Sequence, residues 1–203
     1  MKKSIFKEGK KYTFRDYFYL PNPVEDIVAE LGYSYSLEVL QLPTSASCNV
    51  ESVNNLKRTY YNVLPKISLN SETAKREFLI APVLFELAKE TDLKINVEYP
   101  IDVSELLSGY LDYLIRYKQE LIVIEAKKGD IDRGFNQLAA ELIALDQYEE
   151  EGGSTLYGVV TIGEMWVFCT LDRKKKKITR DMHNYTIPED VEGIFRILVG
   201  IIG

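Results

Sequence analysis

Apolar residues alternate with short polar interruptions along this chain, and the strongest such pattern lies in residues 109–128, GYLDYLIRYKQELIVIEAKK. Two apolar runs flank the polar pair Lys118-Gln119, which predicts a β-hairpin that turns at this pair. Side chains of a strand point alternately to its two faces. The second run therefore places two sets of side chains on opposite faces: Leu121, Val123, Glu125 and Lys127 on one, and Ile122, Ile124, Ala126 and Lys128 on the other.

Two acids of this hairpin are expected to face each other. A hairpin that folds symmetrically about Lys118-Gln119 places Asp112 directly opposite Glu125, with their Cβ atoms about 5 Å apart. Because neighbouring carboxylates repel each other and lose hydration in a half-buried sheet, the pair needs a compensating group. A divalent cation that takes oxygen ligands, such as Mg²⁺, meets this need, and Lys127 on the same face would contact a water bound to it.

The alternative is that these charges carry no function. Glu125 and Lys127 would then form an ordinary charged strand edge, with Asp112 in a turn. We favour the site, because both acids interrupt strongly apolar strand runs, where a charge is normally avoided.

The remaining periodicity predicts a chain of alternating helices and strands. The helix in the middle of the chain contains Pro82, which removes one helical hydrogen bond and is expected to kink or split it. A hairpin around Gly163 and a solvated turn at residues 173–177, RKKKK, follow in the last third. We expect helices over residues 23–31, 50–64, 72–90, 131–150 and 188–202, and further strands over residues 36–43, 94–100, 155–161 and 166–171.

Four segments, in this order, carry a resemblance to a known family. They are SETAKREFLIAPVL (residues 71–84), SGYLDYLI, VIEAKK and GVVTIGEMWVFCTL (residues 158–171). Asp112 followed by Glu125-Ala126-Lys127 resembles the motif of the PD-(D/E)xK, or restriction-endonuclease-like, nuclease superfamily. The ordered set resembles the N-terminal nuclease domain of type I restriction enzyme R subunits and covers roughly the last two thirds of the chain.

The resemblance implies a fold and a domain organisation. The expected fold is an α/β three-layer sandwich, in which a mixed central sheet is flanked by the helices over residues 72–90 and 131–150. Residues 68–203 would form the nuclease-like core, and residues 1–67 an accessory region packed on it. A length of 203 residues with 46% hydrophobic residues suits such a globular unit.

The resemblance also implies a chemistry, the hydrolysis of DNA phosphodiester bonds by an Mg²⁺-dependent deoxyribonuclease of the restriction or repair type. Asp112, Glu125 and the backbone carbonyl of Ala126 would hold the ion, for which Mn²⁺ is the expected substitute. Lys127 would orient the attacking water or neutralise charge on the phosphate, a role that suits a compact ammonium group.

Three further residues are candidates for this site. A glutamate of the first family helix often completes the metal site, and both Glu72, with Arg76 one turn later, and Glu77 fit that description. Glu72 could equally be an acid that stabilises the start of its helix. In RecB-like relatives a glutamine on the later helix lies near the metal, which points to Gln137, although Glu141 stands where those relatives have a tyrosine; an exposed glutamine without a role is the alternative.

The net negative charge of the chain favours a second hypothesis about its function. The formal net charge of −6 and the pI near 5.0 argue against non-specific binding of nucleic acid. A catalytically inactive nuclease-fold module that binds nucleic acid or a protein partner is therefore the alternative function, and a homo-oligomer is a further option. Local basic residues, Lys127-Lys128 and residues 173–177, could still serve a phosphate channel.

Other chemistries and locations fit the sequence poorly. The lone histidine, His183, and the absence of a Gly-x-Ser-x-Gly elbow oppose a serine triad, and there is no Walker-type phosphate loop. Cys48 and Cys169 are too far apart in sequence to suggest zinc and fit a reducing interior. The basic amino terminus lacks the apolar core of a secretory signal, and residues 195–202 are too short to span a bilayer, so we expect a cytoplasmic protein without membrane contact.

Overall fold

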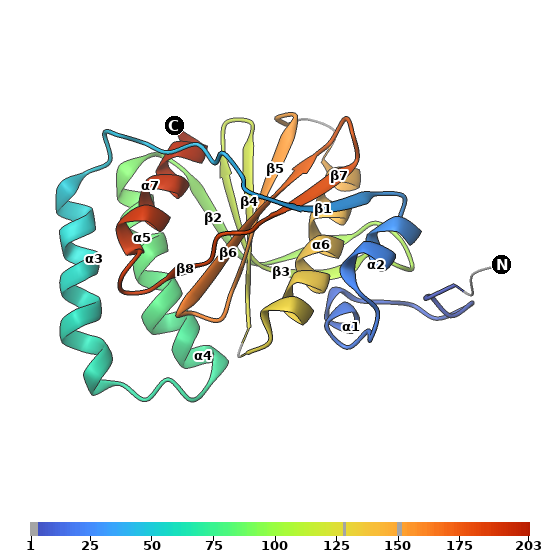
Figure 1. The fold of residues 1–203 in the computed structure, drawn as a ribbon, viewed down its shortest axis with the longest axis horizontal. Helices are drawn as coiled ribbons and strands as arrows, with labels where there is room; N and C mark the ends of the chain where they lie inside the picture. The colour runs from blue at the N-terminus through green and yellow to red at the C-terminus, as the bar shows by residue number, and fades with distance from the viewer. Residues whose placement is uncertain (1–3, 128, 150–151) are drawn as a thin grey trace.

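The computed structural model describes residues 4–127, 129–149 and 152–203, and these form an α/β fold around one mixed sheet (Figure 1). The sheet contains eight strands within the described residues, in the order β1-β7-β6-β5-β4-β3-β2, with β8 paired to β6. Most neighbours are antiparallel, whereas β1 with β7 and β4 with β5 are parallel. The strands are β1 (Ser34–Glu38), β2 (Lys94–Asp102), β3 (Ser108–Tyr117), β4 (Glu120–Ala126), β5 (Thr155–Thr161), β6 (Met165–Asp172), β7 (Lys177–Asp181) and β8 (Tyr185–Thr186).

Helices cover both faces of the sheet, which confirms the expected α/β sandwich with a mixed sheet (Figure 1). One face carries α1 (Phe14–Phe18), α2 (Val24–Glu30) and α6 (Ile131–Tyr148). The other carries α3 (Val50–Val63), η1 (Leu64–Lys66), α4 (Glu72–Lys75), η2 (Arg76–Ile80), α5 (Ala81–Glu90) and α7 (Val191–Ile202). Within the described residues, no helix is both long and apolar enough to cross a lipid bilayer.

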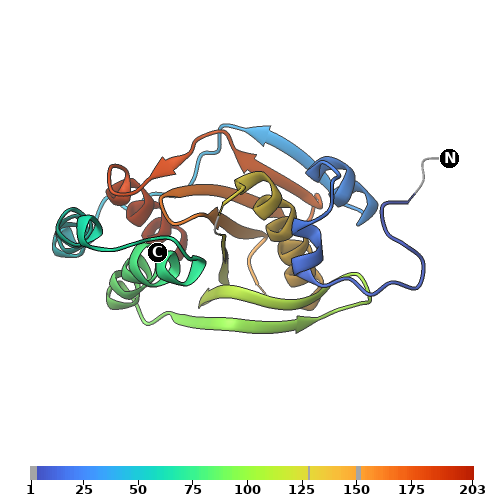
Figure 2. The ribbon, with the colours of Figure 1, turned by 90° about the horizontal axis from the view of Figure 1, so that it is seen from below.

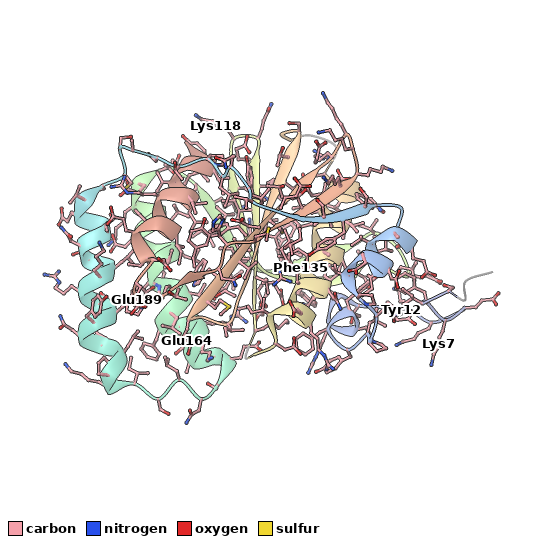
Figure 3. All side chains as sticks on the ribbon, in the orientation of Figure 1. Lys7, Tyr12, Lys118, Phe135, Glu164 and Glu189 are labelled. Carbon is pink, nitrogen blue, oxygen red and sulfur yellow. The ribbon has the colours of Figure 1, made fainter. Side chains whose placement is uncertain are left out.

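The alternation of β4 divides the core into two clusters. Leu121 and Val123 lie in the cluster under α6, whereas Ile122 and Ile124 lie in the cluster under α5 and α7. The predicted stripe of α6 packs on the sheet, and Phe135 lies between that helix and the strands (Figure 3). Both faces of β4 are therefore buried, which makes any charge at its end exceptional.

The β3–β4 hairpin has the predicted register. Tyr117 pairs with Glu120 and Tyr113 with Ile124, so the ladder ends one residue before Asp112 and Glu125. Lys118 lies at the tip, where its φ of 50° gives the left-handed backbone of a tight two-residue turn (Figure 3). From β4 the chain runs through α6 to β5, which is parallel to β4 as expected for this crossover.

The helix predicted over residues 72–90 is split, as Pro82 suggested. A π-helical turn, η2, separates α4 from α5, and Ala81 donates its N–H to the carbonyl of Arg76 five residues earlier. Because Pro82 has no N–H, the regular hydrogen-bond pattern cannot continue through this point. The wider π-helical turn changes which side chains of this segment point toward the end of the sheet that carries Asp112 and Glu125. It therefore affects which of the two candidates, Glu72 or Glu77, reaches that end.

Several predicted boundaries are wrong. β1 ends at Glu38 rather than residue 43, because the pairing with its partner β7 ends at Asp181. The last helix begins at Val191, since residues 187–190 form a turn in which the Asp190 carboxylate accepts from the N–H of Thr186. The short elements α1, β7 and β8 were not predicted. Lys128 and Glu150, which the predictions included, lie outside the described residues.

Residues 4–67 pack on the rest of the chain. β1 extends the sheet, and α1 lies beside α6 (Figure 2). The segment before α1 is fixed to the start of β3: the N–H of Tyr12 donates to the Glu105 carbonyl at 2.7 Å, and the Ser108 hydroxyl donates to the Tyr12 carbonyl. These contacts hold α1 beside the part of β3 that carries Asp112.

Candidate active site

A pocket of about 630 Å³ opens at the end of the β3–β4 hairpin. Asp112, Glu125 and Lys127 all line it, so the fold brings together the three residues of the predicted motif. The remaining walls come from α4, α6 and the segment around α1. These other lining residues are Thr13, Phe14, Arg15, Phe18, Tyr19, Glu72, Gly109, Tyr110, Gly129 and Gln137.

Glu125 is the most deeply buried acid that lines the pocket, with 1% of its surface exposed. Its Oε1 accepts a 2.7 Å hydrogen bond from the Gln137 amide and forms an ion pair with the Lys127 ammonium. Its Oε2 is buried and has no hydrogen-bond partner among the described residues. Burial and the negative charge of Asp112 raise the pKa of Glu125 to about 7, although Lys127 opposes this shift.

Asp112 reaches across from β3 to the neighbouring strand. Its Oδ2 accepts a 2.9 Å hydrogen bond from the N–H of Ala126, directly after Glu125. Its Oδ1 lies 3.6 Å from the guanidinium of Arg76, which η2 supplies from the other side of the sheet. A backbone N–H of the neighbouring strand thus holds the Asp112 carboxylate, and the Arg76 guanidinium offsets part of its charge.

Lys127 lies just beyond β4, with its ammonium against Glu125. Burial lowers the pKa of Lys127, but the carboxylates of Glu125, Glu141 and Asp112 outweigh it, so the pKa lies above its ordinary value and the side chain is a cation. The ring of Phe18, 5.5 Å from the ammonium, adds a cation–π contact. Room for the lysine stem depends on Gly134, because a Cβ there would lie 3.0 Å from its Cγ.

Gln137 lines the pocket and is not exposed on the flank of its helix. It is buried, and its Nε2 donates to Glu125 and also to Oε1 of Glu141 at 2.8 Å. Glu141 is fully buried one helical turn further along α6. Burial and the negative charge of Glu125 raise the pKa of Glu141 well above its usual range.

Glu141 was not predicted as part of this cluster. The sequence did contain a usable indication, because an acid one turn after Gln137 interrupts the apolar residues of this helix. The chain therefore carries a second buried carboxyl group, that of Glu141, in the same cluster as Glu125.

The two helix glutamates differ in position. Glu72 lines the pocket from α4, whereas Glu77 is exposed on η2 and does not line it. Within η2, the residue turned toward the acids is Arg76, which contacts Asp112, Glu98 and the hydroxyl of Tyr113. The structure thus brings Glu72, and not Glu77, to the other candidate residues.

The segment of residues 13–19 also lines the pocket, which the sequence pattern did not predict. No residue pattern in this segment links it to the hairpin. The link depends on contacts between distant parts of the chain: the Tyr17 hydroxyl donates to the Leu106 carbonyl at 2.8 Å, and Phe14 packs against Gly109. Gly109 has a φ of 142°, and a Cβ at this residue would lie 2.9 Å from Cδ2 of Phe14.

The oxygen atoms that line the pocket supply some, but not all, of the ligands that a hard cation such as Mg²⁺ requires. Two carboxylates of the hairpin line the pocket, and the buried Oε2 of Glu125 lacks a partner. Among residues 4–127, 129–149 and 152–203, however, no three histidine, cysteine, aspartate or glutamate side chains are grouped closely enough to hold a metal ion by themselves. Backbone carbonyls and waters would therefore have to supply the remaining ligands.

The fold and the pocket define an α/β protein with two acids and one lysine at the end of a buried hairpin. Comparison with protein-family models found no match to the sequence. Comparison with curated proteins found no match either.

Proposed function

We propose that this chain is a metal-dependent nuclease that hydrolyses phosphodiester bonds of DNA. The observation that carries the proposal is the convergence of Asp112, Glu125 and Lys127 in one pocket, at the end of a hairpin with the predicted register. The acid pair would hold a cation, and the ammonium would lie next to the scissile phosphate.

The topology supports a restriction-endonuclease-like fold. An antiparallel hairpin, β3–β4, is followed by a helix on one face and by a parallel neighbour, β5. The motif residues lie at the end of this hairpin, and α3, α5 and α7 cover the face opposite to α6. The segments that resemble the R-subunit nuclease domain correspond to α4 to α5, β3, β4, and β5 to β6, in that order.

A magnesium ion, or manganese in its place, would be held by Asp112, Glu125 and the carbonyl of Ala126. Oxygen ligands and retained waters are what this ion prefers. When bound, it would polarise a phosphoryl oxygen and lower the pKa of a coordinated water. The unpartnered Oε2 of Glu125 supports this assignment, because a buried carboxylate oxygen without a donor costs free energy that a cation would offset.

The residues of the chain would contribute orientation and charge. Gln137 fixes Glu125 by its hydrogen bond, and the N–H of Ala126 fixes Asp112. Lys127 would stabilise the negative charge that develops on the phosphate and donate a hydrogen bond to the attacking water. The water oxygen would bond to phosphorus and release a proton to solvent, the P–O3′ bond would break with its electron pair passing to the 3′ oxygen, and that oxygen would take up a proton from solvent, which would leave a 5′ phosphate and a 3′ hydroxyl.

The test is cleavage of labelled DNA in magnesium, in manganese and in EDTA. We expect Glu125→Gln and Asp112→Asn to lower the cleavage rate by about 100-fold or more, since each removes a carboxylate that would hold the catalytic ion. Glu77→Gln is the matched control, because it removes an exposed acid from the neighbouring helix. Equal rates for wild type and Glu125→Gln would reject the proposed site.

A binding module without catalysis is the second candidate. It is favoured by the net charge of −6, and by the ion pair that already occupies Oε1 of Glu125. Calorimetric titration with Mg²⁺ or Mn²⁺ separates the two functions: a nuclease site should bind the ion in wild type and lose that binding in Asp112→Asn. A binding module would show no Asp112-dependent heat, and its ligand would be nucleic acid, a protein partner or a second copy of the chain.

A further inference from the structure

Two exposed tyrosines line the pocket that contains the acids. Tyr19 is 62% exposed and Tyr110 is 66% exposed, and both belong to the pocket lining. One follows α1, and the other lies in β3 close to Asp112. Single exposed aromatic residues are common on protein surfaces, but two on one pocket that also contains a candidate phosphate site call for a ligand with flat apolar faces.

Strand pairing, ring packing and a hydrogen bond hold the two tyrosines in place. Tyr110 belongs to a strand that pairs with β2 at Pro100. Tyr19 packs edge-on against Phe18, with ring centroids 5.3 Å apart, and its helix is fixed by the hydrogen bond from Tyr17 to Leu106. A ligand that stacks on these rings would therefore pay little conformational entropy for ordering the protein.

A cationic side chain, Arg15, lines the same pocket as these two tyrosines. Arg15 lines the pocket and is exposed, and it forms no ion pair within the described part of the chain. The other described cation of the lining, Lys127, is paired with Glu125. Arg15 is thus the cation that is free to meet a phosphate outside the acid cluster.

We infer that the pocket takes an unpaired DNA strand, whose bases stack on Tyr19 and Tyr110 while Arg15 contacts a phosphate. Stacking on aromatic side chains is how proteins hold single strands, because the bases of a single strand are free to leave their neighbours. Duplex binding depends mainly on many phosphate contacts. A chain with a net charge of −6, and with Arg15 as the one free cation among the described residues that line this pocket, is poorly equipped for that mode.

This inference rests on the proposed function and specifies its substrate. The test measures fluorescence anisotropy of a labelled oligodeoxythymidylate and of a duplex of the same length, with calcium as the divalent ion and a gel to verify that the DNA is intact. We expect the single strand to bind at least about tenfold more tightly than the duplex. Tyr19→Ala and Tyr110→Ala should each weaken single-strand binding about fivefold or more.

Matched variants separate stacking from loss of structure. Tyr19→Phe and Tyr110→Phe keep the rings and should bind nearly as well as wild type. Tyr61→Ala removes a tyrosine that is 58% exposed on α3, outside the pocket lining, and should change nothing. Arg15→Ala should reduce the salt dependence of binding, the slope of log K against log salt, by about 0.7.

The outcomes distinguish this inference from the nuclease proposal. Tyrosine-dependent binding of single strands without any metal-dependent cleavage would support the inference and count against catalysis. Cleavage that requires Glu125 but acts equally on duplex DNA, with Tyr19→Ala and Tyr110→Ala unchanged, would overturn the inference and leave the nuclease intact. Equal binding of both DNA forms would overturn it as well.

Discussion

The amide of Gln137 donates hydrogen bonds to two buried carboxyl groups at once, to Glu125 at 2.7 Å and to Glu141 at 2.8 Å. Helix α6 is thereby tied to the end of strand β4 at the centre of the candidate site. Because the amide has only these two N–H donors, each acid depends on it for orientation. This shared donor makes the site sensitive to changes on a helix that does not carry the metal ligands.

Replacement of Gln137 by methionine should therefore destabilise the protein. The substitution keeps the size of the side chain but removes the amide donor from two buried carboxyl groups, Glu125 and Glu141, and each lost hydrogen bond costs about 1–3 kcal/mol. Urea unfolding measures the change. Gln41→Met, at an exposed glutamine after β1, is the control and should have an effect below about 0.5 kcal/mol.

Stability of the metal-free protein should fall as the pH rises from about 5 to 8. The pKa of Glu125 is about 7 in the folded protein against 4.5 ordinarily, and that of Glu141 is also raised. The folded state therefore binds more protons than the unfolded state in this window, so the free energy of unfolding decreases with pH. Unfolding in urea at several pH values, with EDTA present, measures this slope.

The variant Glu141→Gln tests the cause of that slope. A neutral amide at this position cannot ionise, so the loss of stability between pH 5 and pH 8 should become smaller, and the variant should be more stable than wild type at pH 8. If the two proteins have the same slope, the pH dependence comes from other groups.

Magnesium should stabilise the folded protein if the two hairpin acids hold it. A ligand at about 100 times its dissociation constant adds about 2.7 kcal/mol to the free energy of unfolding, which thermal unfolding detects as a rise in Tm. EDTA should reverse the rise. Asp112→Asn should remove it, whereas Glu77→Gln, which changes an exposed acid outside the pocket lining, should retain it.

Gly109 is required for the wall that α1 contributes to the pocket. Gly109→Ala would place a Cβ 2.9 Å from the ring of Phe14 at a backbone φ of 142°, so we expect a loss of about 1–3 kcal/mol and weaker activity. Gly129→Ala is the control for stability, because a Cβ there meets no atom within 4 Å. Unfolding curves that coincide for the two variants would show that the α1 wall tolerates the change.

Local residue patterns were sufficient for the hairpin and for the motif at its end. The polar pair Lys118-Gln119 sets the turn, and the period of two then places Val123 and Ile124 on opposite faces. The same holds for the stripe of α6 and for the break at Pro82. These features depend on residues that are close in sequence, so the chain specifies them before any tertiary contact forms.

Packing between distant segments decided the rest of the site. Whether Glu72 or Glu77 faces the pocket follows from the π-helical turn that places Arg76 against Asp112, and Glu141 joins Glu125 because α6 crosses β4 at this point. The wall from residues 13–19 exists because that segment is hydrogen-bonded to residues at the start of β3. Such contacts depend on the relative positions of whole elements, which periodicity along one strand or helix does not encode.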